Sequence, residues 1–114
     1  MGDEVKKLNE FRKEMNERIL AGGNLEIKRF FALDKNAYKD GALTAETKEL
    51  LGLVASLVLR CSDCVTYHLQ RCFEIGLTDE QLHEAFNVGL VVGGSIVIPH
   101  LRKAVAMLDE LRAG

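Results

Sequence analysis

The chain has 114 residues, 47% of them apolar and 28% charged, which is enough to bury a core of its own. Its formal net charge is −2 with acidic and basic residues intermixed, so it lacks the basic stripe that binds nucleic acids or anionic membranes. No apolar run reaches the roughly 18 residues of a membrane helix, and the first residues lack the apolar segment of a signal peptide. We therefore expect one domain over residues 1–114, in the cytoplasm, without nucleic-acid or membrane partners.

The pattern of apolar residues predicts an all-α fold. Leucine, alanine, glutamate and lysine dominate, proline occurs once, and no strand-like alternation persists. The first two expected helices are Val5–Ile19, which ends before Gly22-Gly23, and Leu25–Tyr38, which ends before Asp40-Gly41. A third helix is capped by Thr44 and carries Leu50 to Val58, and a fourth covers about Ser62–Glu74 before Gly76. A fifth begins at the capping box Thr78–Gln81 and is interrupted at Gly93-Gly94, and the last covers about Pro99–Leu111, with a start that can be as early as Ser95.

The stretch 88–98 is apolar on every side. A helix in so small a domain buries one stripe against its own core, so the opposite side needs a partner subunit. We therefore expect a homo-oligomer. The alternative is a central helix buried within the monomer.

Two cysteines at the start of the fourth predicted helix carry the most specific chemical signal. Cys61 and Cys64 lie about 60° apart at 100° per residue, with His68 between them at the edge of the apolar face. The first-turn N–H groups and the helix dipole favour a thiolate there, and Ser62 or Asp63 is a candidate cap. A neighbouring histidine activates a thiol, and a second thiol closes the disulfide. The spacing therefore predicts a redox-active pair.

Glu49 is a further candidate, on the border of the third helix's apolar face. Gly52 beside it lets another helix approach, so Glu49 can point toward the cysteines if the third and fourth helices pack antiparallel. Its carboxylate would then orient His68 or relay its proton. Tyr67 and His100 are possible lining residues. The helical projection puts Tyr67 on the solvated side, and His100 can equally be a structural or interface residue.

Other interpretations of these residues remain open. The two cysteines can be small core residues, or they can ligate zinc together with His68 and Glu49. Three ligands in close succession on one helix make tetrahedral geometry awkward, so we expect neither metal nor cofactor. Cys72 falls on the same stripe and is expected to be a buried apolar residue.

A family resemblance follows from the combined spacing Glu49-x11-Cys61-Ser62-Asp63-Cys64-x3-His68 and its surroundings. Over about residues 40–112 the chain resembles the carboxymuconolactone decarboxylase family, in its alkylhydroperoxidase D-like branch. Tyr67-His68, Gly76, Gly93-Gly94 and Pro99-His100 belong to the same pattern. The resemblance implies a compact orthogonal bundle of about six helices, a trimer or hexamer, and thiol-dependent reduction of hydroperoxides.

The resemblance also implies roles. Cys64 attacks a small peroxide or disulfide, Cys61 resolves the product, Glu49 and His68 relay the proton through water, and an external dithiol resets the pair. Asp63 stands where the longer hydroperoxidases carry a second histidine, and a carboxylate there disfavours a thiolate. The alternatives are a lactone decarboxylase, which would use His68 or His100 with Glu49, and a non-catalytic redox-sensing or binding module.

Overall fold

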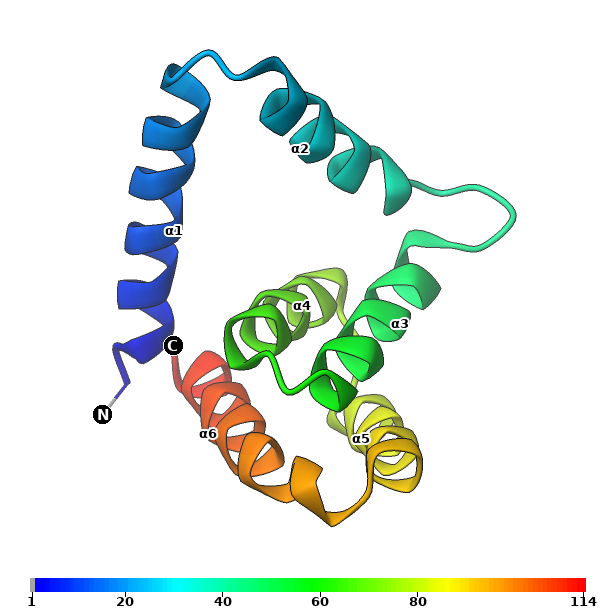
Figure 1. Ribbon diagram of the computed structural model, residues 1–114. Helices are drawn as coiled ribbons and strands as arrows, with labels where there is room; N and C mark the ends of the chain where they lie inside the picture. The colour runs from blue at the N-terminus through cyan, green and yellow to red at the C-terminus, as the bar shows by residue number, and fades with distance from the viewer. Residues whose placement is uncertain (1) are drawn as a thin grey trace.

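The computed structural model describes residues 2–114, which form six α-helices and one turn of 3-10 helix (Figure 1). The helices are α1 (Glu4–Ala21), α2 (Leu25–Ala37), α3 (Ala45–Val58), α4 (Ser62–Ile75), α5 (Asp79–Gly93) and α6 (Ile98–Ala113), with the 3-10 turn η1 (Ser95–Val97) before α6. The predicted all-α fold is confirmed, and the predicted helices appear in the predicted order. Across residues 2–114, no helix is both long and apolar enough to cross a membrane.

Local signals place the helix ends. The side chains of Asn24 and Thr44 each accept a hydrogen bond from the backbone three residues on, at the starts of α2 and α3. Thr78 and Gln81 form the predicted capping box at the start of α5. Gly76 ends α4 with a φ of 94°, a left-handed conformation that glycine adopts without steric cost.

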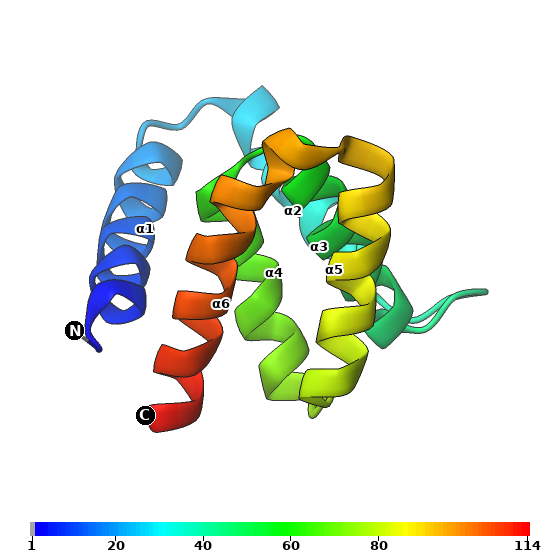
Figure 2. The ribbon, with the colours of Figure 1, turned by 90° about the horizontal axis from the view of Figure 1, so that it is seen from below.

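Helices α3 to α6 form the bundle that holds the core (Figure 2). Helix α3 packs against α4 and α5, and α4 packs against α6. The core consists of apolar side chains from all four helices and the segments that join them: Leu53, Leu57, Val65, Leu69, Cys72, Leu77, Leu82, Phe86, Val97, Ala104 and Leu108. Glu49 on α3 and Cys64 and His68 on α4 therefore belong to helices that form the core.

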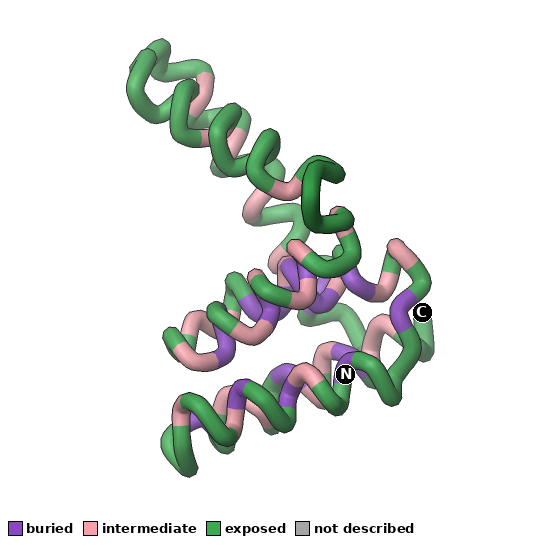
Figure 3. Tube along the Cα trace, turned by 90° about the vertical axis from the view of Figure 1, so that its right-hand side faces the viewer, coloured by how far each residue is buried: buried purple, intermediate pink, exposed green. Residues whose placement is uncertain are grey.

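Helices α1 and α2 form an arm beside this bundle. Helix α1 is anchored near its start, where Val5 is buried and its N–H donates to Glu110 Oε1 at 2.7 Å. Among the described residues Leu25–Ala37 of α2, none is buried. Buried residues gather in the lower half of Figure 3, whereas α2 and the C-terminal half of α1 are exposed or half-buried.

The apolar stretch 88–98 is divided between the core and the surface. Gly89 and Val97 are buried, whereas five large apolar side chains of the stretch are exposed: Val88, Val91, Val92, Ile96 and Ile98. The alternative of a helix buried on all sides within the monomer is therefore wrong for this chain. The predicted partner subunit remains a prediction.

We expect Thr78→Ala to lower the free energy of unfolding by about 1 kcal/mol, because the Gln81 N–H loses the hydroxyl that it contacts at 3.2 Å. Urea unfolding at one fixed protein concentration measures the change. Thr78→Ser keeps the hydroxyl and serves as the control. A loss in the serine variant as large as in the alanine variant would contradict the capping explanation.

Candidate active site at the start of helix α4

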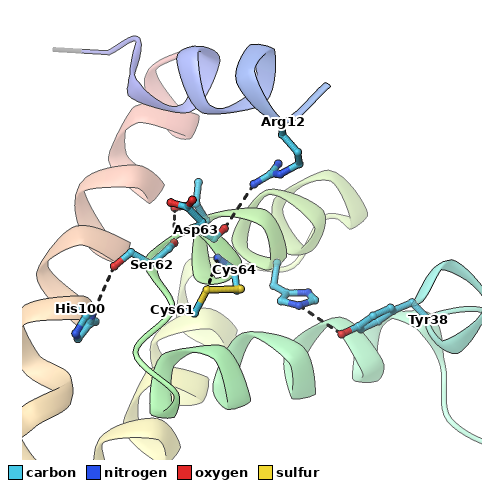
Figure 4. The surroundings of a disulfide bond; sticks show 9 residues. Arg12, Tyr38, Cys61, Ser62, Asp63, Cys64 and His100 are labelled. Carbon is cyan, nitrogen blue, oxygen red and sulfur yellow. Dashed lines mark hydrogen bonds between the residues drawn. A yellow bond between two sulfur atoms is a disulfide. The ribbon is translucent and has the colours of Figure 1, made fainter. Parts of the chain in front are cut away.

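Cys61 and Cys64 are joined by a disulfide at the start of α4, with their Cα atoms 5.3 Å apart (Figure 4). Cys61 itself is the N-cap, and its Sγ accepts a hydrogen bond from the Cys64 N–H at 3.3 Å. The prediction that Ser62 or Asp63 caps α4 is therefore wrong. Arg60, just before the pair, has a φ of 61°, a left-handed conformation that is uncommon outside glycine. This bend joins α3 to α4 through only three residues.

The short connection brings Glu49 of α3 against His68 of α4. The two side chains are buried, with 3% and 8% of their residue surface exposed, and Glu49 Oε1 lies 2.8 Å from His68 Nδ1. The second carboxylate oxygen, Oε2, lies 3.8 Å from Arg71 Nε. A carboxylate only accepts hydrogen bonds, so Nδ1 donates and Nε2 is left as the acceptor. The pair therefore fixes both the orientation and the tautomer of the histidine.

Two tyrosines flank the same imidazole ring. The Tyr38 hydroxyl, at the end of α2, lies 3.4 Å from His68 Nε2, and the rings of Tyr38 and Tyr67 are each centred 5.2 Å from the His68 ring. Burial is the largest cause that raises the pKa of both phenols, with Asp34 next for Tyr38 and Glu49 next for Tyr67. Both hydroxyls are therefore protonated at neutral pH, and Tyr38 donates to Nε2.

Cys64, Tyr67 and His68 border a cleft of about 420 Å³ between α1, α2 and α4. Its lining residues are Arg12, Asn16, Phe30, Phe31, Asp34, Asp63, Cys64, Tyr67 and His68. The Arg12 guanidinium lies 5.0 Å from the centre of the Tyr67 ring and 3.5 Å from the Asp63 carbonyl oxygen (Figure 4). Cys64 is exposed, so a molecule in the cleft has access to its sulfur.

The structure places the six predicted site residues in two groups. Glu49, Cys61, Cys64, His68 and Tyr67 lie together, although Tyr67 is half-buried rather than solvated as its position on the helix suggested. His100 on α6 contacts the Ser62 hydroxyl at 3.2 Å and is not among the residues that line the cleft.

Sequence reasoning missed Tyr38 and Arg12. The arm brings Tyr38 to His68, 30 residues away in the sequence, and Arg12 to Asp63, 51 residues away, and nothing in the local sequence indicates either contact. Within the described part of the chain, no group of three or more His, Cys, Asp or Glu side chains is placed to hold a metal ion.

The fold and the site together define a class of protein: helical bundles that carry a disulfide at the start of one helix, beside a buried histidine–carboxylate pair. The model of the carboxymuconolactone decarboxylase family matches residues 27–107, which include all of these groups. Protein 4 of the cox locus of Paracoccus denitrificans is 33% identical over 97 residues, 85% of this chain and 86% of its own length. A Cupriavidus necator protein is 31% identical over 103 residues, 88% of this chain and 91% of its own. The chain therefore belongs to the carboxymuconolactone decarboxylase family.

Solved structures agree with this membership. A crystal structure from Thermotoga maritima is 58% identical with a TM-score of 0.92, over 95% of both chains. Another from the same organism, 57% identical with a TM-score of 0.90, covers 94% of this chain and 91% of its own. It is described as a family protein with a suggested involvement in antioxidative response. A Legionella pneumophila family protein, 23% identical with a TM-score of 0.87 over 95% and 96% of the chains, shares the fold.

Cys72 should differ from the other two cysteines in reactivity. Burial, and then the charge of Glu49, raises its pKa from 9.0 to about 12, so the thiol stays protonated at pH 8. After reduction, we expect two thiols per chain to react rapidly with an alkylating reagent, and the third to react only on unfolding. Cys72→Ser should lower the count in unfolded protein by one and leave the rapid count unchanged. Three rapid thiols in native wild-type protein would contradict this assignment.

Gly52 provides the space that the His68 ring occupies. A Cβ at this position would lie 2.6 Å from ring atom Cε1 and 2.8 Å from Nε2, both too close. We expect Gly52→Ala to displace the ring and lower the free energy of unfolding by about 1–2 kcal/mol after the helix preference of alanine is counted. The Nδ1 proton resonance of His68 and urea unfolding measure the two effects. Gly41→Ala, whose Cβ would lie 3.6 Å from Lys48 Nζ, is the control and should change neither.

Proposed function

We propose that this protein is a thiol-dependent oxidoreductase of the alkylhydroperoxidase D-like branch, which reduces a small hydroperoxide or disulfide through Cys61 and Cys64. The observation that carries the proposal is the shared cleft, because the exposed Cys64 and the Glu49-held His68 border the same space. A reactive thiol needs an accessible sulfur and a neighbouring base, and both are present in this cleft. The antioxidative involvement suggested for the Thermotoga maritima relative agrees with this chemistry.

The cycle begins with the reduced pair. The Cys64 thiolate attacks the outer oxygen of a hydroperoxide, so that an S–O bond forms, the O–O bond breaks, and the alkoxide leaves as an alcohol after taking a proton. Cys61 then attacks the Cys64 sulfenic acid, so that the S–S bond forms, the S–O bond breaks, and hydroxide leaves as water with the Cys61 proton. With a disulfide substrate, Cys64 attacks one sulfur and releases the other as a thiol, and Cys61 then attacks the mixed disulfide, so that the Cys61–Cys64 bond forms and the second substrate thiol leaves. An external dithiol reduces the Cys61–Cys64 bond and is itself oxidised.

His68 is the proposed carrier of the proton. Because Nδ1 donates to Glu49, Nε2 is the basic nitrogen, and the Tyr38 hydroxyl already donates to it. The Cys64 thiol proton can therefore reach Nε2 through water and the Tyr38 hydroxyl, which takes up one proton as it passes its own to Nε2, and the same path returns a proton to the alkoxide. The buried Glu49 carboxylate stabilises the imidazolium that forms between these two steps. Glu49 therefore acts through His68, whereas His68 exchanges the proton.

Two opposite charges near Cys64 influence its thiolate. The Asp63 carboxylate disfavours the anion, whereas the Arg12 guanidinium, which reaches the Asp63 carbonyl across the cleft, favours it. The first-turn N–H groups of α4 favour it as well, because the macrodipole is positive at this end of the helix. We therefore propose that the positive charge of Arg12 partly offsets the effect of the Asp63 carboxylate on the Cys64 thiolate, so that the pair remains active.

Hydroperoxide consumption with a small dithiol donor tests the proposal. We expect Cys64→Ser and Cys61→Ser to abolish turnover, and His68→Ala or Glu49→Gln to lower the rate by about 10²–10⁴-fold, the usual contribution of a positioned acid–base group. In Cys61→Ser protein, one equivalent of peroxide should produce a sulfenic acid on Cys64 that mass spectrometry detects as one added oxygen.

Cys72→Ser is the matched control, because it removes a buried cysteine of the same helix that does not line the cleft. It should retain the wild-type rate. A rate in Cys64→Ser equal to that of wild type would contradict the thiol mechanism. A Cys61–Cys64 disulfide that forms reversibly, without hydroperoxide consumption with any dithiol donor, would instead indicate a redox sensor.

A further inference from the structure

Arg71 is a second neighbour of the Glu49 carboxylate, besides His68. It stands three residues after His68 on α4, so the two side chains lie on neighbouring parts of the helix surface. His68 Nδ1 lies 2.8 Å from Glu49 Oε1, and Arg71 Nε lies 3.8 Å from the other oxygen, Oε2. Among the described residues, no further lysine, arginine or histidine forms an ion pair with this carboxylate. His68 and Arg71 therefore share the charge of Glu49.

Arg71 is a permanent cation that its own helix holds in place. Its Nη1 donates to Glu74 Oε1 at 2.7 Å. This hydrogen bond is the largest cause that raises the pKa of Arg71, and the charges of Glu74 and then Glu49 raise it further, against the opposing effect of burial. The Arg71 side chain is 44% exposed, whereas that of Glu49 is 4% exposed. A partly exposed guanidinium therefore places a fixed positive charge against a buried carboxylate.

Arg71 faces a different space from the cleft that contains Cys64. It lines a second hollow, of about 920 Å³, together with Glu49, Tyr38 and Tyr67. It is not among the residues that line the cleft of about 420 Å³. The other titratable groups near the histidine–carboxylate pair are Tyr67 and Cys72 of α4, Tyr38 at the end of α2, and Asp34, Lys35, Lys39 and Asp40, which line the hollow. A change at Arg71 therefore alters the charge beside Glu49 without changing the space in front of Cys64.

A proton carrier has to release its proton as well as accept it. The buried Glu49 carboxylate stabilises the imidazolium of His68, which by itself makes the proton harder to return. The charge of Arg71 acts in the opposite direction, because it repels the imidazolium and neutralises part of the carboxylate charge that attracts it. Removal of that charge therefore strengthens the hold of His68 on its proton.

We propose that Arg71 is a positioning residue of the site, which acts through Glu49 to keep the proton of His68 exchangeable. This role rests on the proposed function, because His68 is the proton carrier there. With Arg71 in place, His68 stays neutral, and able to accept the thiol proton, down to a lower pH than Glu49 alone would allow. Arg71 therefore helps to set the pH below which the reaction slows.

Titration of the His68 ring in the oxidised protein, followed by NMR, tests this effect without turnover, because neither sulfur of the disulfide titrates. We expect Arg71→Gln to make His68 bind its proton about three- to tenfold more tightly, so that the midpoint of its titration rises by about 0.5–1 pH unit. Arg71→Lys retains the charge and should restore most of the wild-type midpoint. His83 and His100, the other two histidines, should not shift.

Arg29→Gln is the matched control, because it removes the same charge from another arginine that pairs with a glutamate three residues away, at 3.2 Å on α2. It should leave the His68 midpoint as in wild type. A midpoint in Arg71→Gln that is unchanged or lower would overturn the proposal, as would an equal rise in Arg29→Gln. Circular dichroism checks the folding of each variant, and Arg71→Met, which keeps an apolar stem, provides the same measurement if the glutamine variant does not fold.

The pH dependence of hydroperoxide consumption separates this role from the proposed function. We expect the acid side of the Arg71→Gln rate profile to move to higher pH by the same amount as the His68 midpoint, with a rate at pH 8 within about threefold of wild type. A shifted midpoint with an unmoved rate profile would overturn the role of Arg71 in the reaction. A shifted midpoint in a protein whose wild type shows no turnover would instead contradict the proposed function, and would support the effect of Arg71 on His68.

Discussion

The hydrogen bond between Glu49 and His68 is the interaction on which the arrangement of the site depends. A carboxylate that is 3% exposed is costly unless its oxygens are satisfied, and here His68 and Arg71 surround it. Among the described residues, no buried side-chain nitrogen or oxygen lacks a hydrogen-bond partner. Because Glu49 belongs to α3 and His68 to α4, their contact also fixes how these two helices meet. The small side of α3 at Gly52 is what allows the ring to lie there.

The site combines two parts of the fold that differ in packing. The sulfurs, Glu49 and His68 lie on α3 and α4, whose inward faces form the core. The other wall of the cleft comes from α1 and α2, which contribute few buried residues. The groups to which we assign the chemistry therefore lie on the helices that form the core, whereas the arm supplies the outer wall of the cleft.

Much of the fold could be predicted from the sequence, because its signals are local. The Thr78–Gln81 box, Gly76 and the apolar spacing act within a few residues, and the structure places helix ends close to where they indicated. The sequence alone leaves the contact between Glu49 and His68 open, since this contact requires the packing of two helices. Tyr38 could not be predicted, because its contact joins residues 30 apart through a loosely packed arm.

The predicted exposure of Tyr67 was wrong, because a helical projection considers only the helix itself, whereas Arg12 of the arm covers the outer side of the Tyr67 ring. Capping preferences favoured Ser62 or Asp63 because they are derived from oxygen-bearing side chains, whereas here a sulfur takes that place.

If the pair works as proposed, the sulfur cap at the start of α4 couples the stability of that helix to the reduction of the disulfide. Cys61 Sγ accepts the Cys64 N–H in the disulfide, where sulfur is a weak, neutral acceptor. After two electrons enter the pair, a thiolate formed at this helix start is stabilised by the positive end of the helix and its free N–H groups. Any free energy by which the start of α4 stabilises that thiolate is also free energy by which the protein would prefer its reduced form. In the proposed cycle the helix start would therefore influence how readily the pair gives up its electrons, and substitutions in the first turn of α4 would alter that tendency without changing either cysteine.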